Sequence, residues 1–202
     1  MKSESLNAIR GRPKTLNRDH VLDVAMHAYW EGGVDNVSIN EICKKAKISK
    51  PGLYREFGNE DGLKKAALVA FHKNVITPLL EMVAFDRPFK ETLNNIVIMV
   101  SSINDHQDAK GCLMVKMLQS RMRMGTETRK QIDLFQGQIL TTFEDWVERS
   151  KVKEEFSIEM SSKFAAAYIH AQINNALTQM AKGDDKDSIR EILRIALSVL
   201  LR

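Results

Sequence analysis

Apolar residues recur with helical spacing along almost the whole chain. In the first segment they occupy one stripe, at Val21, Leu22, Ala25, Ala28 and Tyr29. This spacing is the pattern of an amphipathic helix. Asn17 is a residue type that caps helix N-termini well, and the Gly32-Gly33 pair can end a helix. We therefore predict a first helix between these two signals.

Two short helices are expected next. Ser38 and Glu41 match the S-x-x-E capping box, and the apolar stripe behind them is short. The sequence "KAKI" (residues 45–48) predicts a tight bend. Ser49 can cap the following helix, Pro51 fits its first turn, and the glycine after "LYREF" ends it.

The remaining sequence predicts longer helices. Asn59 can cap a fourth helix, with Glu60 and Asp61 in its first turn, where carboxylates interact favourably with the helix dipole. Pro78 predicts a kink or an end in that helix. Five further helical stretches are expected, at residues 88–105, 111–124, 126–151, 157–183 and 186–202. About nine helices, with no credible strand and no internal repeat, indicate an all-α fold.

The composition agrees with a helical protein and bounds its class. The chain has 202 residues, 44% of them hydrophobic, with only 4 Pro and 10 Gly, which suits one large or two small domains. No apolar run is long enough to span a membrane, and the N-terminus lacks the apolar core of a secretory signal. Cys43 and Cys112 are expected to be free thiols, and the protein is predicted to be cytoplasmic.

Charge is unevenly distributed along the chain. The net charge is +4, and most of the excess lies in the first 65 residues. We divide the chain into a basic flexible arm (1–16), a unit of short basic helices (17–65) and a unit of long, nearly neutral helices (66–202). A basic excess alone is weak support for a polyanionic partner, because many soluble proteins carry one.

The two short helices and their bend match the pattern of a helix-turn-helix. In this motif the second helix enters the major groove of DNA, and its first residues reach base edges. Six residues of the second helix are candidates for DNA contact: Ser49, Lys50, Pro51, Gly52, Tyr54 and Arg55. Lys50 can donate to guanine or to phosphate, and Gly52 lets the backbone approach the duplex closely. From spacing alone, a solvated surface helix is an equal alternative.

The stretch "VSINEICKKAKISKPGLYREFGNEDGL" resembles the DNA-binding domain of the tetracycline-repressor (TetR) family of bacterial regulators, and the likeness extends over residues 17–66. The resemblance implies a homodimer with three N-terminal DNA-binding helices and a C-terminal helical domain for ligand binding and dimerisation. It also implies release from operator DNA by a small molecule. The matching positions are Ser38 and Tyr54 as phosphate contacts, and Ser49, Lys50, Pro51 and Gly52 as the base-reading start of the recognition helix.

One position departs from the family pattern. Glu60 follows the capping Asn59, where the family usually has a lysine that meets phosphate. A carboxylate there would repel the DNA backbone, and Lys64 or Lys65, one turn further on, is expected to compensate. A helical sensor or interaction protein without operator binding is the alternative that Glu60 leaves open.

A basic run, "RGRPK", precedes the first helix. Its cations are Arg10, Arg12 and Lys14, and its "RGRP" core resembles segments that enter the minor groove of A·T-rich DNA. The alternative is a disordered tail that adds only non-specific attraction to DNA.

Candidates for ligand binding come from the second unit. They are Met99, His106, Met117, Arg121, Phe135, Tyr168, His170 and Asn174. Methionine adapts to irregular apolar pockets, although ordinary core packing explains the same residues. His170 and Asn174 lie one turn apart and share a helix face, although a partly exposed or dimer-facing pair is the favoured interpretation. The histidines lack metal-ligand spacing, so neither a metal nor another cofactor is expected.

Cys112 offers a second kind of trigger. It follows Gly111 at an expected helix N-terminus, a setting that can lower a thiol pKa, with Lys110 and Lys116 nearby. The resemblance adds that some family members carry a cysteine sensor in such a "GCL" sequence. We favour a buried, unreactive cysteine, because a free cysteine packs as a small hydrophobic residue, and keep the thiol sensor as the alternative.

The last two helices are expected to form a dimer interface. Small residues in "FAAAYIHAQINNALTQM" allow close helix approach, and one stripe of the final helix holds Ile189, Ile192, Leu193, Ala196, Leu197 and Leu200. Paired across a two-fold axis, these helices would make a four-helix bundle; two core helices of one subunit are the alternative.

Paired carboxylates with histidine, a nucleophile elbow and a phosphate loop are all missing, so no enzyme is indicated. The sequence predicts a ligand-responsive dimeric regulator, a repressor by resemblance, that binds a pseudo-palindromic operator.

Overall fold

The computed structural model describes residues 17–102, 111–156 and 159–201. The helices are α1 (Arg18–Gly32), α2 (Ile39–Ala46), α3 (Lys50–Phe57), α4 (Glu60–Phe71), α5 (Thr77–Ala84), α6 (Phe89–Ser102), α7 (Leu113–Gln119), α8 (Thr126–Val152), α9 (Ser162–Lys182) and α10 (Lys186–Ser198). A π turn, η1 (His72–Ile76), joins α4 to α5, and a 3-10 turn, η2 (Arg121–Arg123), follows α7. The described ranges contain helices and no strand, which confirms the all-α prediction.

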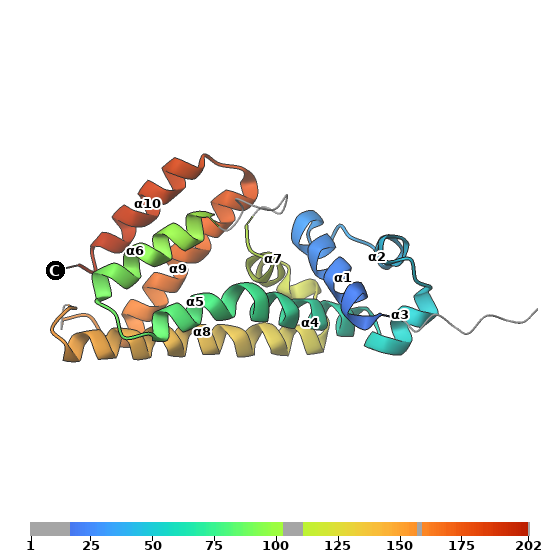
Figure 1. The fold of residues 1–202 in the computed structure, drawn as a ribbon, viewed down its shortest axis with the longest axis horizontal. Helices are drawn as coiled ribbons and strands as arrows, with labels where there is room; N and C mark the ends of the chain where they lie inside the picture. Colours follow the sequence, from blue (N-terminus) through green and yellow to red (C-terminus); the bar gives the residue numbers. More distant parts are fainter. Residues whose placement is uncertain (1–16, 103–110, 157–158, 202) are drawn as a thin grey trace, which may run out of the picture.

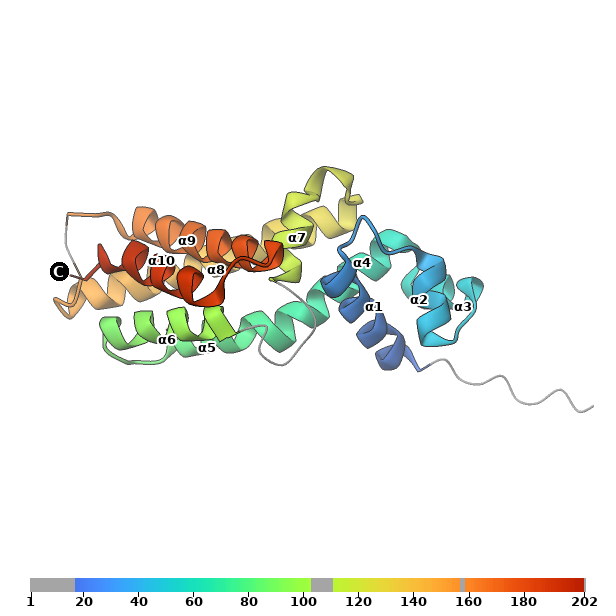
Figure 2. The ribbon, with the colours of Figure 1, turned by 90° about the horizontal axis from the view of Figure 1, so that it is seen from above.

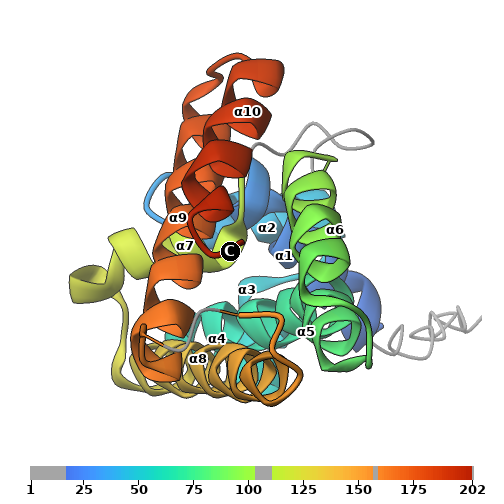
Figure 3. The ribbon, with the colours of Figure 1, turned by 90° about the vertical axis from the view of Figure 1, so that its left-hand side faces the viewer.

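The molecule is elongated, with two groups of helices at opposite ends. Figures 1 and 2 show α1, α2 and α3 at one end and α5, α6, α9 and α10 toward the other. The long α8 runs beside α4 and α5, and α4 contacts both α1 and α8. In Figure 3 the helices α5 and α8 lie below α6, α9 and α10, and α10 contacts both α6 and α9. The helix α4 is therefore the element that the two ends share.

The predicted capping residues hold the ends of the first four helices. The side chains of Asn17, Ser38, Ser49 and Asn59 each accept a hydrogen bond from a backbone N–H three residues on, at 2.9–3.2 Å. These N–H groups have no partner inside the helix, so each cap satisfies one of them. The bend after α2 is made by Lys47, whose φ of 54° lies in the left-handed region that non-glycine residues seldom adopt. The bend therefore lies where the sequence predicts it. The residue that adopts the left-handed conformation there is a lysine and not a glycine.

The predicted disturbance at Pro78 is a change of helix type and not an end. Proline has no N–H to donate within the helix and crowds the preceding turn. The chain widens into the π turn η1 just before Pro78, and the Thr77 hydroxyl donates to the His72 carbonyl oxygen at 3.2 Å.

By length and mean hydropathy the run Glu60–Ala84 could also cross a membrane. Core helices of soluble proteins meet the same criteria, and Leu63, Leu68 and Phe71 in this run are fully buried.

One continuous cluster of buried apolar side chains runs through both ends of the molecule. At the junction, the Trp30 ring of α1 meets the Phe71 ring of α4 edge-on, with centroids 4.9 Å apart. Further along, Phe89 of α6 stacks on Trp146 of α8 at 4.5 Å. The helices of the first unit therefore pack directly on the second.

The apolar stripe expected on the last helix is divided between two faces. Ile189, Leu193, Leu197 and Leu200 are buried inside the subunit, whereas Ile192 is exposed. A second stripe of exposed apolar residues on α10 consists of Ile192, Ile195 and Val199. Since helical spacing separates these two sets by about a third of a turn, one stripe serves the subunit core and the other faces outward.

Candidate DNA-binding surface and ligand pocket

The start of α3 is an exposed, polar and basic surface. Ser49, Lys50 and Pro51 are exposed, as is Arg55 in the next turn. Leu53 and Phe57 are buried and fix the helix against its neighbours. Gly52 differs from its expected role, because it is buried beside Leu53 and its backbone does not lie on the exposed surface. The exposed start of the helix therefore consists of Ser49, Lys50 and Pro51.

A groove between α2, α3 and α4 brings together residues that lie far apart in the sequence. We call it the α2–α3 groove, and its polar lining consists of Asp35, Asn36, Ser38, Asn40, Lys50, Tyr54, Glu60 and Lys64. The Lys50 ammonium lies 5.6 Å from the centre of the Tyr54 ring, a cation–π arrangement. Asn40 was not predicted, although an exposed amide in the first turn of a capped helix is a suitable phosphate donor.

Glu60 and Lys64 form an ion pair inside this groove. The Lys64 Nζ lies 2.7 Å from Glu60 Oε1, and the side chain of Lys64 is only 12% exposed against 50% for Glu60. Lys65 points elsewhere and pairs with Glu127 of α8 at 3.1 Å. Of the two lysines expected to compensate for Glu60, Lys64 is therefore the one that pairs with it, and compensation at the DNA backbone stays a prediction. The pair is neutral overall, so the groove gains no net positive charge from it.

Three candidates for DNA contact, Arg10, Arg12 and Lys14, and one candidate for ligand binding, His106, lie outside the described residues. The other DNA-contact candidates all lie at the same end of the molecule, on α2, α3 and α4 (Figure 1).

The C-terminus of α1 is fastened to the segment that leads into α7. The Trp30 indole N–H donates to the Gly111 carbonyl oxygen at 2.9 Å in a buried position. The Lys116 ammonium donates to the Trp30 carbonyl oxygen, and burial lowers the pKa of Lys116. A side chain at Gly111 would collide with Ala181 of α9, and its φ of 75° also favours glycine. We call these hydrogen bonds the Trp30 clamp.

A second connection joins α4 to the start of α8. The Asp61 carboxylate accepts hydrogen bonds from the backbone N–H groups of Glu127 and Thr128, at 2.9 and 3.2 Å, and from the Thr128 hydroxyl. Burial acts to raise the pKa of Asp61, but these hydrogen bonds outweigh it and hold that pKa below its usual value. Asp61 thus caps a helix that begins more than sixty residues later in the chain. A side chain at Gly125 would occupy the position of this carboxylate, so glycine is required there.

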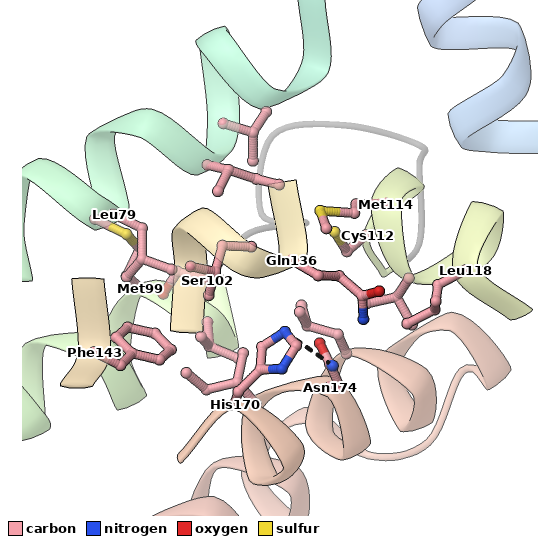
Figure 4. A pocket seen from close by; sticks show the side chains of 17 residues that line it. Leu79, Met99, Ser102, Cys112, Met114, Leu118, Gln136, Phe143, His170 and Asn174 are labelled. Carbon is pink, nitrogen blue, oxygen red and sulfur yellow. Dashed lines mark hydrogen bonds between the residues drawn. The ribbon is translucent and has the colours of Figure 1, made fainter. Parts of the chain in front are cut away.

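The C-terminal helices enclose an apolar pocket of about 260 Å³. We call it the bundle pocket, and it is lined by Val75, Ile76, Leu79, Met99, Val100, Ser102, Cys112, Met114, Val115, Leu118, Gln136, Ile139, Phe143, His170, Ile173, Asn174 and Leu177. Figure 4 shows Phe143, Leu79 and Met99 on one side, with the polar groups of His170, Asn174 and Gln136 nearer the middle. An apolar cavity with a few convergent polar groups is the usual form of a small-molecule site.

Of the predicted ligand-binding residues, Met99, His170 and Asn174 line the bundle pocket. The other four described candidates do not line it. Met117 is buried in the core, and Phe135 stacks on His72 with ring centroids 3.8 Å apart. Arg121 forms an exposed ion pair with Asp133, and the Tyr168 hydroxyl donates to the Ala196 carbonyl oxygen at 2.8 Å. Their side chains are committed to contacts that helical spacing could not reveal.

Gln136 is the main pocket residue that sequence reasoning missed. It lies on the same face of α8 as Ile132, Ile139 and Phe143. The sequence did contain a signal for Gln136, namely a polar residue inside an otherwise apolar stripe. Burying an amide without a hydrogen-bond partner costs free energy, so such a residue indicates a polar partner or a ligand. On the opposite wall, the Asn174 amide and the His170 Nε2 lie 3.2 Å apart, and burial lowers the pKa of His170. The imidazole is therefore neutral near pH 7.

Cys112 lines the bundle pocket and is buried, as the favoured interpretation of the sequence expects. Burial raises the pKa of its thiol to about 11, because the opposing effects of the Val115 and Met114 backbone N–H groups and of the Lys116 charge are smaller. The thiolate is the reactive form of cysteine, so this setting suppresses its reactivity. The alternative, a reactive thiol with a lowered pKa, is not supported. Within the described ranges, no cluster of His, Cys, Asp and Glu suited to a metal ion is found.

An all-α fold, a capped helix-turn-helix with an exposed basic helix and a separate apolar pocket are the features of a DNA-binding transcriptional regulator. The family model described as "Bacterial regulatory proteins, tetR family" matches residues 21–67. Residues 21–67 therefore have the sequence of a TetR-family DNA-binding domain.

Comparisons with individual proteins agree with this assignment. The chain is similar to the transcriptional repressor ComR of Escherichia coli, at 41% identity over 59 residues, which cover 29% of this chain and 28% of ComR. It is similar to the E. coli transcriptional repressor BdcR at 23% identity, over 74% of this chain and 75% of BdcR. A cysteine-substituted form of the TetR-family regulator CifR, solved with double-stranded operator DNA, has the same fold, with a TM-score of 0.81 at 19% identity over 94% of this chain and 100% of that one.

Proposed function

We propose that this protein is a homodimeric, cytoplasmic repressor that binds a pseudo-palindromic operator and is released by a small molecule in the bundle pocket. Residues 17–65 would form the DNA-binding unit, residues 66–202 the unit for effector binding and dimerisation, and residues 1–16 a basic arm. The names of its relatives ComR and BdcR, both repressors, support the direction of regulation.

DNA contact would be made by the start of α3 and by the α2–α3 groove. Ser49, Lys50 and Pro51 are exposed and would face base edges in the major groove, with Arg55 beside them. Ser38, Tyr54 and Lys64 share one groove, which suits the phosphate contacts that fix the register of the protein on the duplex. Arg10, Arg12 and Lys14 would add contacts from the arm.

The observation that carries the proposed release is the double role of the segment around α7. Cys112, Met114 and Leu118 line the bundle pocket, and Gly111 and Lys116 of the same segment hold Trp30 through the Trp30 clamp. A ligand that displaces this wall of the pocket would therefore also displace the end of α1. Because α1 packs on α2 and α4, its movement would shift the recognition helix. The segment around α7 and the end of α1 would thus have a displaced and an undisplaced arrangement. A ligand changes operator affinity to the extent that its own binding free energy differs between these two arrangements.

Dimerisation would use the outward faces of the last two helices. The exposed stripe Ile192, Ile195 and Val199 on α10 is accompanied by exposed Phe164 on α9. Exposed apolar groups gathered on two adjacent helices favour an interface, and a two-fold pairing would bury both sets against each other.

Selection of genomic DNA fragments by the purified protein tests the core of this proposal. Footprints on the selected fragments should contain two half-sites related by a two-fold axis. Lys50→Ala and Tyr54→Phe variants should lose these fragments while retaining wild-type circular dichroism. Selected fragments without paired half-sites, or unchanged binding by both variants, would refute operator recognition by this surface.

A thiol trigger at Cys112 receives less support. The thiol lines the bundle pocket, but its raised pKa keeps it in the less reactive protonated form. Release from DNA should therefore survive the Cys112→Ser substitution.

A further inference from the structure

The charge of the bundle pocket limits what it can hold. Among the described residues that line it, there is no Asp, Glu, Lys or Arg. The one titratable imidazole, His170, is kept neutral because burial lowers its pKa. A buried ion without a partner loses its hydration and gains nothing in return, at a cost of several kcal/mol. An anionic or cationic ligand would therefore find no charged partner among the described residues of this pocket.

The polar side chains of the pocket indicate which kind of polar group the ligand carries. When the Asn174 amide donates to His170 Nε2, the imidazole carries its proton on Nδ1. That N–H and the side-chain amide oxygen (Oδ1) of Asn174 then lack hydrogen-bond partners among the described residues, and the same holds for the Gln136 side chain. The pocket thus offers donors and acceptors within one patch, which Figure 4 shows facing the cavity. A ligand group that both donates and accepts would satisfy them.

The volume sets the size. An apolar cavity of about 150 Å³ holds a benzene molecule, so the roughly 260 Å³ of this pocket suits a ligand of about ten non-hydrogen atoms. Phe143, Leu79 and Met99 surround the part of the cavity that would take an apolar body.

We infer that the bundle pocket binds compact, uncharged molecules that combine an apolar ring or short chain with one carboxamide or hydroxyl group, directed at His170, Asn174 and Gln136. This inference rests on the proposed function for the claim that such a molecule is the effector. The ligand class itself follows from the pocket alone.

Three probes of matched shape and different charge test the class. They are p-toluamide, which is neutral, p-toluate, which is an anion, and p-toluamidinium, which is a cation; each has about ten non-hydrogen atoms, the size inferred from the cavity. Titrations of the full-length protein, followed by ligand-observed NMR, should give a Kd for p-toluamide at least about tenfold lower than for either ion. Equal or tighter binding of p-toluate or p-toluamidinium would overturn the inference, and so would failure of all three to bind.

Two variants separate this pocket from other binding sites. Asn174→Leu removes the amide at nearly constant size and should weaken p-toluamide binding about tenfold, whereas Ile98→Ala on the exposed face of α6 should leave it unchanged. If Asn174→Leu does not fold, Gln136→Leu provides the same comparison from the opposite wall. Unchanged p-toluamide affinity in a folded pocket variant would show that the amide lies elsewhere.

An operator-binding titration then tests the effector role of the pocket separately from the class of ligand that it binds. If p-toluamide binds as expected but leaves operator affinity unchanged, the ligand class stands and the effector role of the pocket fails. If an ion binds preferentially and releases the operator, the effector role stands and the ligand class is wrong.

Discussion

The carboxylate of Asp61 in α4 caps the N-terminus of α8 through Thr128, which donates to it from both its backbone N–H and its hydroxyl. This contact fixes the helix shared by both ends of the molecule to the longest helix of the C-terminal unit. Its geometry also makes it sensitive to protonation, because only the ionised carboxylate accepts all of these hydrogen bonds.

The Asp61→Asn variant should therefore be less stable by about 1–2 kcal/mol at pH 7. The pKa of Asp61 in the folded protein is lowered, so its contribution is complete at neutral pH. That contribution is lost as the pH falls below its ordinary value of 3.8 and through its value in the fold. Urea denaturation of both proteins, from pH 7 to well below pH 3.8, measures this difference. A gap that stays constant over the whole range would mean that the charge of Asp61 contributes nothing.

The Trp30→Phe variant tests whether the Trp30 clamp transmits effector binding. Losing the indole N–H leaves the buried Gly111 carbonyl oxygen unpaired and should cost about 1–3 kcal/mol of stability. The change in operator affinity caused by an effector should also shrink, while effector affinity measured without DNA is retained. Trp146→Phe is the matched control, because the buried Trp146 indole N–H has no hydrogen-bond partner among the residues that the structure describes. Equal loss of coupling in both variants would assign the effect to general loosening of the core.

Glu60→Lys should tighten binding to operator and to unrelated DNA alike. The substitution removes a carboxylate from the α2–α3 groove, frees Lys64 from its ion pair and adds a cation. We expect a gain of about fivefold to tenfold at moderate salt, with a salt dependence steeper by about one phosphate contact. Glu56→Lys makes the same change in net charge outside this groove and should have a smaller effect. If the two variants bind equally well, residue 60 does not lie near phosphate.

Ile195→Asp should dissociate the proposed dimer. The substitution introduces a charge into each half of a self-complementary apolar interface, which should weaken dimerisation at least about a hundredfold. Ile98→Asp is a matched control, because Ile98 on α6 is 58% exposed and Ile195 is 55% exposed. Light scattering after size-exclusion chromatography gives the mass of each variant. A dimeric Ile195→Asp protein would exclude this face of α10 as the interface.

Removal of residues 1–14 should weaken operator binding and flatten its dependence on salt. The deleted segment contains Arg10, Arg12 and Lys14, so the slope of log K against log salt should fall by up to about three phosphate contacts. A·T pairs flanking the half-sites should matter for the full chain and not for the truncated one. An unchanged slope would leave the arm without a role at the phosphates.

The parts of the structure that depend on neighbours in sequence could be predicted from the sequence. Asn17, Ser38, Ser49 and Asn59 were identifiable as caps because each bonds to an N–H only three residues away. The exposed basic start of α3 was also predictable, because it depends on the residue types and their spacing within one short segment.

The pocket depends on packing between distant helices, and its prediction was less complete. Arg121 was a reasonable ligand candidate, but it bonds to Asp133 across the turn into α8, and Tyr168 bonds to the backbone of α10. The sequence carries no local signal for either contact. Gln136 could have been found, since it interrupts an apolar stripe, whereas the positions of Val75 and Leu79 at the pocket depend on how α4 and α5 pack against α8.

The edge-on contact of Trp30 with Phe71 bears on how operator specificity could be transferred between regulators. A chimera with its junction at residue 65 would pair the α1 of one protein with the Phe71 of another, and would cut through packing that the two ends share. A graft that extends through Phe71 and brings the segment from Gly111 to Lys116 with it keeps Trp30 with all of its native partners. In this protein the exchangeable unit is therefore discontinuous in sequence, and homologous recombination at a single crossover would seldom deliver it intact.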